Sequence, residues 1–153
     1  MCKKEVEEMI KLPPIEKIPE AYSAIQDNRV EMFDDHANVK SSNGEKEYLI
    51  KWKDNVIYSN DNSTYWQGYP GYPVIAVLLL QGKLSLNCDV LPYFANVDWN
   101  ALNKETKRDY KESVNRVLKD VEMSEKEEIF KELEKVFEEI KNLDIVLSKK
   151  KDL

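Results

Sequence analysis

The side chains best suited to acid–base chemistry lie around the single histidine. His36 follows Asp34 and Asp35, whose carboxylates could raise the pKa of the imidazole and make it a proton carrier. The alternative is an exposed histidine in a hairpin turn, where aspartate is common. No GxSxG, P-loop, GxGxxG or HExxH pattern occurs in the chain. An acid–base site near His36 is therefore a hypothesis, and no catalytic residue is assigned.

Metal ligands of the kind that zinc prefers are scarce. Besides His36 the chain offers only Cys2 and Cys88, and these three positions lack the paired spacing of a zinc site. Two cysteines are also too few for a disulfide framework, so both are expected to be free thiols in a reducing compartment. We expect no metal, no cofactor and a cytoplasmic location.

Aromatic side chains are concentrated between Tyr58 and Gly82, in the passage YSNDNSTYWQGYPGYPVIAVLLLQG. Tyrosine and tryptophan provide large, stiff contact surfaces with a polar end, so this aromatic loop could bind a base, a sugar or a peptide. Alternatively, the same rings pack onto the end of the sheet and close the core. The candidate binding residues are Tyr58, Tyr65, Trp66, Tyr69 and Tyr72.

Length and charge limit the remaining possibilities. The chain has 153 residues, about one domain, and 29 acidic against 23 basic residues give a net charge of -6. This charge disfavours nucleic acid and anionic membranes as partners. The longest apolar run, Val74–Leu80, is too short to span a bilayer. Abundant Lys and Glu with little His are typical of thermophilic proteins.

The hydrophobic pattern predicts an α+β fold. A small antiparallel β-meander of three to four strands packs on a buried helix, flanked by short N-terminal helices and a C-terminal helical hairpin. Asn43-Gly44 predicts a type I′ turn, and Gly82 a left-handed helix cap. Helices are expected over 3–12, over a short segment that begins at Pro19, over 73–81, over 99–121 with Asp98 as the N-cap, and over 124–148. Strands are expected over 29–33, 37–41, 47–53 and 55–58.

The domain division follows from these elements. Residues 1–121 form one α+β domain, and residues 124–149 form an amphipathic helix packed on that domain or on a partner. Ser124 with Glu127 predicts a capping box at its start. Its apolar seam has the 3.5-residue spacing of a coiled coil, so a homodimer or partner helix is possible beside packing in cis. The seam residues are Ile129, Leu133, Val136, Ile140, Leu143 and Leu147.

Residues 29–84 resemble a SWIM module, in which a β-hairpin with Cys-x-Cys precedes a Cys-x-His at the start of an apolar helix. RVEMFDDHANVKSSNGEKEYLIKWKDNVIYSNDN resembles the hairpin part, and GYPVIAVLLLQGKL the helix. The four zinc ligands are absent, because Tyr58-Ser59-Asn60 and Gly71-Tyr72-Pro73 stand in their places. The resemblance implies that packing by the loop aromatics replaces the metal between hairpin and helix.

The SWIM resemblance implies a recognition module for DNA or proteins. Because the chain is acidic, a non-catalytic protein-binding module is the leading hypothesis. A nucleic-acid-associated protein that uses the aromatic loop is the first alternative, and a small enzyme near His36 is the second.

Overall fold

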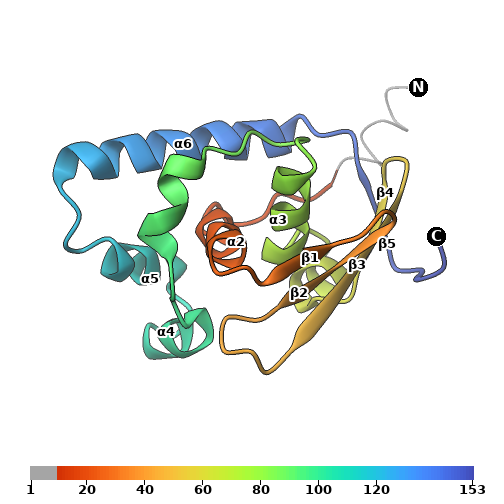
Figure 1. The fold of residues 1–153 in the computed structure, drawn as a ribbon, viewed down its shortest axis with the longest axis horizontal. Helices are drawn as coiled ribbons and strands as arrows, with labels where there is room; N and C mark the ends of the chain where they lie inside the picture. Colours follow the sequence, from red (N-terminus) through yellow and green to blue (C-terminus); the bar gives the residue numbers. More distant parts are fainter. Residues whose placement is uncertain (1–9) are drawn as a thin grey trace.

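A five-stranded sheet with helices on one side forms the core of the molecule (Figure 1). The computed structural model describes residues 10–153. The helix expected over 3–12 and the thiol of Cys2 therefore lie almost entirely outside the described residues. Within the described part, the α+β class and the antiparallel meander are confirmed.

The sheet follows the chain order β1-β2-β3-β4-β5, and the first three pairings are antiparallel. Its two-residue turn at Asp54-Asn55 joins the third and fourth strands, with Asp54 at a φ of 55°. The fifth strand was not expected, and it pairs parallel to β4. The strands are β1 (Val30–Met32), β2 (His36–Lys40), β3 (Glu47–Lys53), β4 (Val56–Ser59) and β5 (Val146–Ser148).

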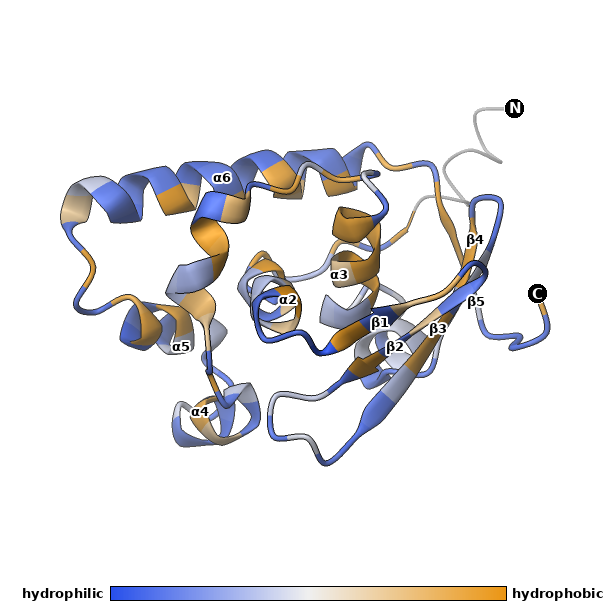
Figure 2. Ribbon diagram, in the orientation of Figure 1, coloured by the Kyte–Doolittle hydropathy of each residue, from blue (hydrophilic) through white to orange (hydrophobic). Residues whose placement is uncertain are grey.

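Helices α2, α3 and α6 surround the main core. The apolar helix α3 is buried along almost its whole length, as its sequence predicts, and Gly82 beyond it has a φ of 77°. Figure 2 shows α3 as hydrophobic beyond its first turn, whereas α6 alternates between hydrophobic and hydrophilic residues. The helical elements are α2 (Lys17–Gln26), the π-helix η1 (Ser63–Gln67), α3 (Tyr72–Leu80), the 3-10 helix η2 (Cys88–Phe94), α4 (Trp99–Glu105), α5 (Tyr110–Val117) and α6 (Met123–Lys141).

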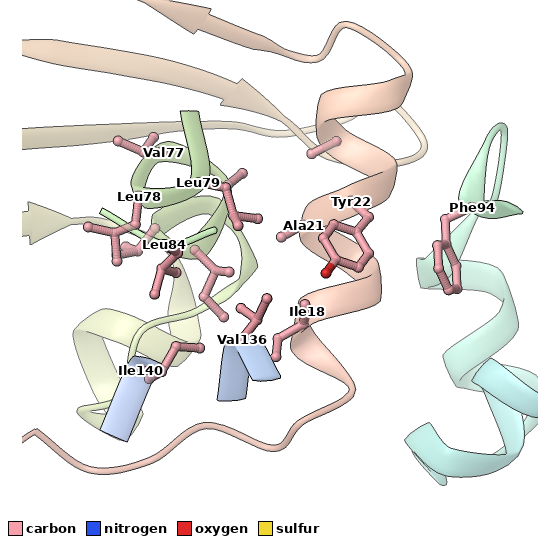
Figure 3. Close-up of a cluster of buried hydrophobic side chains, with 14 of the residues drawn as sticks. Ile18, Ala21, Tyr22, Val77, Leu78, Leu79, Leu84, Phe94, Val136 and Ile140 are labelled. Atoms are coloured by element: carbon pink, nitrogen blue, oxygen red, sulfur yellow. The ribbon is translucent and has the colours of Figure 1, made fainter. Parts of the chain in front are cut away.

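The core joins segments that are far apart in the sequence. Tyr22 of α2 lies between Phe94 on one side and α3 with Leu84 on the other, while Val136 and Ile140 of α6 belong to the same cluster (Figure 3). A buried hydrogen bond from the Trp99 indole to Ser23 Oγ, at 2.8 Å, ties α4 to α2. None of the described helices is long and apolar enough to cross a membrane.

The expected helix over 99–121 is wrong, because the chain forms two shorter helices. Asp98 caps α4 as predicted, accepting from the Ala101 N–H. The chain then turns, with Lys107 and Arg108 at φ values of 55° and 65°. Asp109 starts α5 by accepting from the Glu112 N–H, and this cap competes with a continuous helix.

The last helix ends earlier than its sequence pattern suggests. α6 stops at Lys141, and residues 146–148 instead pair with the edge of β4, where the Val146 N–H donates to the Asn55 carbonyl at 2.9 Å. Unpaired backbone groups at a sheet edge favour this addition over a further helical turn. The helix begins at Met123 after Glu122, so the expected capping box at Ser124 does not form.

The hairpin turn at Asn43-Gly44 also differs from the prediction. Six residues, 41–46, separate β2 from β3, and only Gly44 has positive φ, at 75°. The Asn43 side chain accepts from the Glu45 N–H and from Ser41 Oγ. These side-chain bonds stabilise a wider loop than a type I′ turn.

Candidate functional site

The structure separates the five aromatic candidates into different environments. Tyr58 is buried in β4, and Tyr72 opens α3 with most of its ring covered. Tyr69 is half-buried at the edge of a pocket. Tyr65 and Trp66 lie on η1, where Trp66 is 70% exposed. The packing alternative therefore fits Tyr58 and Tyr72, and the binding hypothesis stays a prediction for the exposed Trp66.

Asp61 holds the aromatic loop to the start of α3. Its carboxylate accepts from Ser59 Oγ and from the Thr64 N–H, the latter at 3.1 Å. Thr64 Oγ1 in turn accepts from the Gly71 N–H at 2.9 Å. A Cβ atom at Gly71 would overlap Asp61 Oδ2, so only glycine allows the two segments to approach this closely. The hairpin and helix are thus joined by hydrogen bonds, in addition to the Tyr48–Tyr72 edge contact.

A polar pocket of about 460 Å³ opens between the aromatic loop, α2 and the α4–α5 region. The volume lies within the range of small-molecule sites. Unlike most such sites, its lining is dominated by charged, amide and tyrosine side chains. The lining consists of Lys17, Glu20, Tyr48, Asp61, Asn62, Ser63, Gln67, Tyr69, Tyr72, Asn100, Asn103, Lys104, Arg108 and Tyr110.

Charged groups lie buried at the base of this pocket. Lys17, Glu20 and Asp61 are 8%, 5% and 4% exposed. Lys17 Nζ lies 3.6 Å from Glu20 Oε2 and 4.4 Å from the centre of the Tyr110 ring. Asn103 Nδ2 donates to the same Glu20 oxygen at 3.5 Å. Burial of ions is costly unless they are paired, and this arrangement supplies the pairing.

Ionisation in the pocket is shifted by burial. Burial raises the pKa of Glu20, although Lys17 opposes the shift. Burial also raises the pKa of Tyr48, and the negative charges of Asp61 and Glu20 raise it further. Burial likewise raises the pKa of Tyr72. Both phenols therefore remain protonated hydrogen-bond donors at neutral pH.

Trp66 forms a second surface feature with its neighbours. The Tyr65 and Trp66 rings meet edge to face, with centroids 4.8 Å apart. Lys149 Nζ lies 5.5 Å from the Tyr65 centroid and 5.7 Å from the Trp66 centroid. We call Tyr65, Trp66 and Lys149 the Trp66 patch.

His36 lies apart from the polar pocket, at the start of β2. His36 Nδ1 and Asp35 Oδ1 are 2.7 Å apart, and the imidazole stacks on Phe33 with centroids 4.6 Å apart. The hydrogen bond from His36 lowers the pKa of the Asp35 carboxyl. Within residues 10–153, Asp35 is the sole carboxylate paired with His36. This environment resembles the exposed-turn alternative more than an enclosed acid–base site.

The seam of the last helix lies largely in the chain's own core. Ile129, Leu133, Val136 and Ile140 are buried, so they are not accessible to a partner while α6 stays packed. Leu143 lies beyond the helix, and Leu147 is in β5. Both are partly buried against the core.

Sequence reasoning missed the charged residues of the pocket. Lys17 and Glu20 are three residues apart in a helix that carries no other charged residue, and that spacing is a signal that the two charges share one face. Asp61, Asn103 and Arg108 give no comparable signal, because tertiary contacts alone bring them together. Among the described residues, no group of three or more His, Cys, Asp or Glu side chains could hold a metal ion.

The chain matches a model of a protein family. The model described as "Uncharacterised conserved protein UCP014422" matches residues 10–146. The chain belongs to this family. The UCP014422 match includes every residue that lines the polar pocket, whereas Lys149 of the Trp66 patch lies beyond it. No curated protein and no solved structure matches the chain.

Proposed function

We propose that this protein is a non-catalytic binding module that holds a small polar ligand in the polar pocket. The observation that carries the proposal is the burial of Lys17, Glu20 and Asp61 beneath an open, amide-lined cavity. Buried charged groups inside a pocket, such as Glu20 with its raised pKa, are more common at functional sites than elsewhere. The SWIM resemblance of residues 29–84 supports the same broad class, a recognition module.

The competing explanation is that the polar network only fastens α2 to the loop and α4. The two explanations differ at the exposed lining residues Gln67 and Asn100, whose side chains make no hydrogen bond with another described residue. A purely structural network does not need their side chains. A binding site does, because its ligand must replace the hydrogen bonds that it loses to water.

Ligand-detected NMR tests the proposal with the intact chain and a panel of sugars, amino acids, organic acids and nucleotides. Gln67→Ala and Asn100→Ala should weaken any observed binding and leave the melting temperature unchanged. Asn115→Ala, at an exposed position of α5 outside the pocket, is the matched control. Absence of binding across the panel, or binding that ignores both pocket variants, would contradict the proposal.

Recognition of a partner protein is a second candidate function, favoured by the Trp66 patch. An exposed tryptophan beside a tyrosine and a lysine is typical of an interface hot spot. Cross-linking in a lysate should capture a partner with the intact chain and lose it with Trp66→Ala. Equal capture by both proteins would exclude the patch. Binding of single-stranded DNA that weakens steeply with salt would instead support the nucleic-acid alternative.

A further inference from the structure

The charges that face the polar pocket are not balanced. Both buried carboxylates already have partners, since Asp61 accepts from Ser59 and Thr64 while Glu20 is paired with Lys17. Lys104 and Arg108 also line the pocket, and neither forms an ion pair within residues 10–153. A protein with a net charge of -6 thus presents two available cations at one cavity. Such a local excess favours an anionic ligand.

The backbone that carries Arg108 is held in an unfavourable conformation. Lys107 and Arg108 both have the left-handed φ values that glycine and asparagine adopt at least cost. Strain of this kind is concentrated at binding sites. Arg108 lies in this turn and Lys104 near the end of α4, and both line the pocket. The position of Arg108 therefore depends on the strained turn.

The inner part of the pocket is suited to hydroxyl groups. Asn103 Nδ2 donates to Glu20, while its Oδ1 is buried without a hydrogen-bond partner among the described residues. Asn62, Asn100 and Gln67 add exposed amides that can both donate and accept. Groups of this type match the paired donor and acceptor character of sugar hydroxyls. Tyr69 contributes an accessible aromatic surface at the same cavity.

We propose that the polar pocket binds a phosphorylated sugar, with its phosphate at Lys104 and Arg108 and its hydroxyls at the amides around Asn103. This inference rests on the proposed function, because it names the ligand class of the same site. The planar guanidinium of Arg108 matches the geometry of phosphate oxygens, and Lys104 adds a second charge. The sugar phosphate is either free or part of a mononucleotide, whose base would stack on Tyr69.

Isothermal titration calorimetry of the intact chain tests the inference with ribose 5-phosphate, ribose, inorganic phosphate and AMP. Ribose 5-phosphate should bind at least about tenfold more tightly than ribose, and more weakly as salt increases. AMP that binds more tightly than ribose 5-phosphate would identify the nucleotide as the source. Equal affinity would identify the free sugar phosphate.

A pair of matched variants assigns the phosphate site. Arg108→Gln should weaken ribose 5-phosphate by about 10- to 100-fold, the effect of losing a charge-assisted hydrogen bond. Arg116→Gln makes the same change on α5, outside the pocket, and should leave the affinity unchanged. Arg108→Gln should also leave ribose binding unaltered, which separates loss of the phosphate contact from damage to the turn.

The outcomes separate this inference from the proposed function. If ribose or another uncharged compound binds and the phosphate adds nothing, the phosphate assignment is wrong while the pocket remains a binding site. The inference is also wrong if Arg108→Gln and Arg116→Gln have the same effect. If no compound of the wider panel binds, the proposed function itself is wrong.

Discussion

Gly71→Ala tests whether Asp61 fixes the aromatic loop against α3. The backbone at Gly71 has a φ of -74° and a ψ of 174°, which alanine adopts freely. The new methyl group would nevertheless overlap Asp61 Oδ2 and lie 3.0 Å from Ser63 Cβ. Any cost of the substitution is therefore steric, and it falls mainly on the Asp61 carboxylate, the nearest group to the new methyl.

The size of the effect follows from the contacts that must break. To make room, Asp61 has to leave the position where Ser59 Oγ and the Thr64 N–H bind it. Two hydrogen bonds to a charged group are together worth about 3–6 kcal/mol. Alanine also reduces the conformational entropy of the unfolded chain, which raises the free energy of unfolding by about 0.4–1 kcal/mol. The expected loss in the free energy of unfolding is about 2–5 kcal/mol.

Urea unfolding followed by circular dichroism measures this loss. Gly68→Ala is the control in the same loop, because nothing lies within 4 Å of its added methyl and only its φ of 78° opposes alanine. That change should cost about 1 kcal/mol. In an Asp61→Ala background, Gly71→Ala should cost less than about 1 kcal/mol, because the obstructing carboxylate is gone. A small effect of Gly71→Ala alone, or strict additivity with Asp61→Ala, would refute the reasoning.

Three further predictions follow from burial and ionisation. Because burial raises the pKa of Glu20 above its ordinary 4.5, its contribution to stability is fully present below pH 4.5 and is lost as pH rises through the folded pKa. Between pH 4.5 and 7, the free energy of unfolding measured in urea should therefore fall less for Glu20→Gln than for the wild type. The same fall in both proteins would contradict the raised pKa of Glu20. Trp99→Ala should lower the free energy of unfolding by about 3–5 kcal/mol, because the indole is buried and hydrogen-bonded to Ser23. Trp66→Ala removes an exposed ring and should leave the melting temperature almost unchanged. Equal losses of stability in the two variants would place both rings in the core. A chain that ends at Val121 loses four buried side chains of α6, worth about 6–12 kcal/mol together, and should be unfolded by circular dichroism; a folded, monomeric fragment would show that α6 is not part of this core.

Strong local patterns predicted most of the secondary structure. The segment 47–53 matches β3 at both ends, and Pro73 with Gly82 bound the apolar helix α3 as expected. These elements are specified by signals within a few residues, such as alternation, a proline that suits a first turn, and a glycine that accepts positive φ.

Predictions failed where distant parts of the chain compete with local preference. The heptad spacing continues through Leu143 and Leu147, yet the edge of β4 draws residues 146–148 into the sheet. A hydrophobic repeat indicates which residues are buried but not which part of the structure covers them, so the same leucines fit a coiled-coil seam or a strand. In the same way, residues 99–121 carry a helical pattern, but the cap at Asp109 and the turn before it divide the segment.

The sequence by itself determined the α+β class, the meander, the buried helix and the unusual character of the aromatic loop. Only the tertiary structure decided which of those aromatics are core and which are surface, because burial depends on what covers each ring. It alone also brought Lys17 and Glu20 of α2, Asp61 of the loop and Arg108 of the α4–α5 turn to one pocket. The physical reason is that periodicity encodes one face of one element, whereas a site requires the faces of several elements to meet in space.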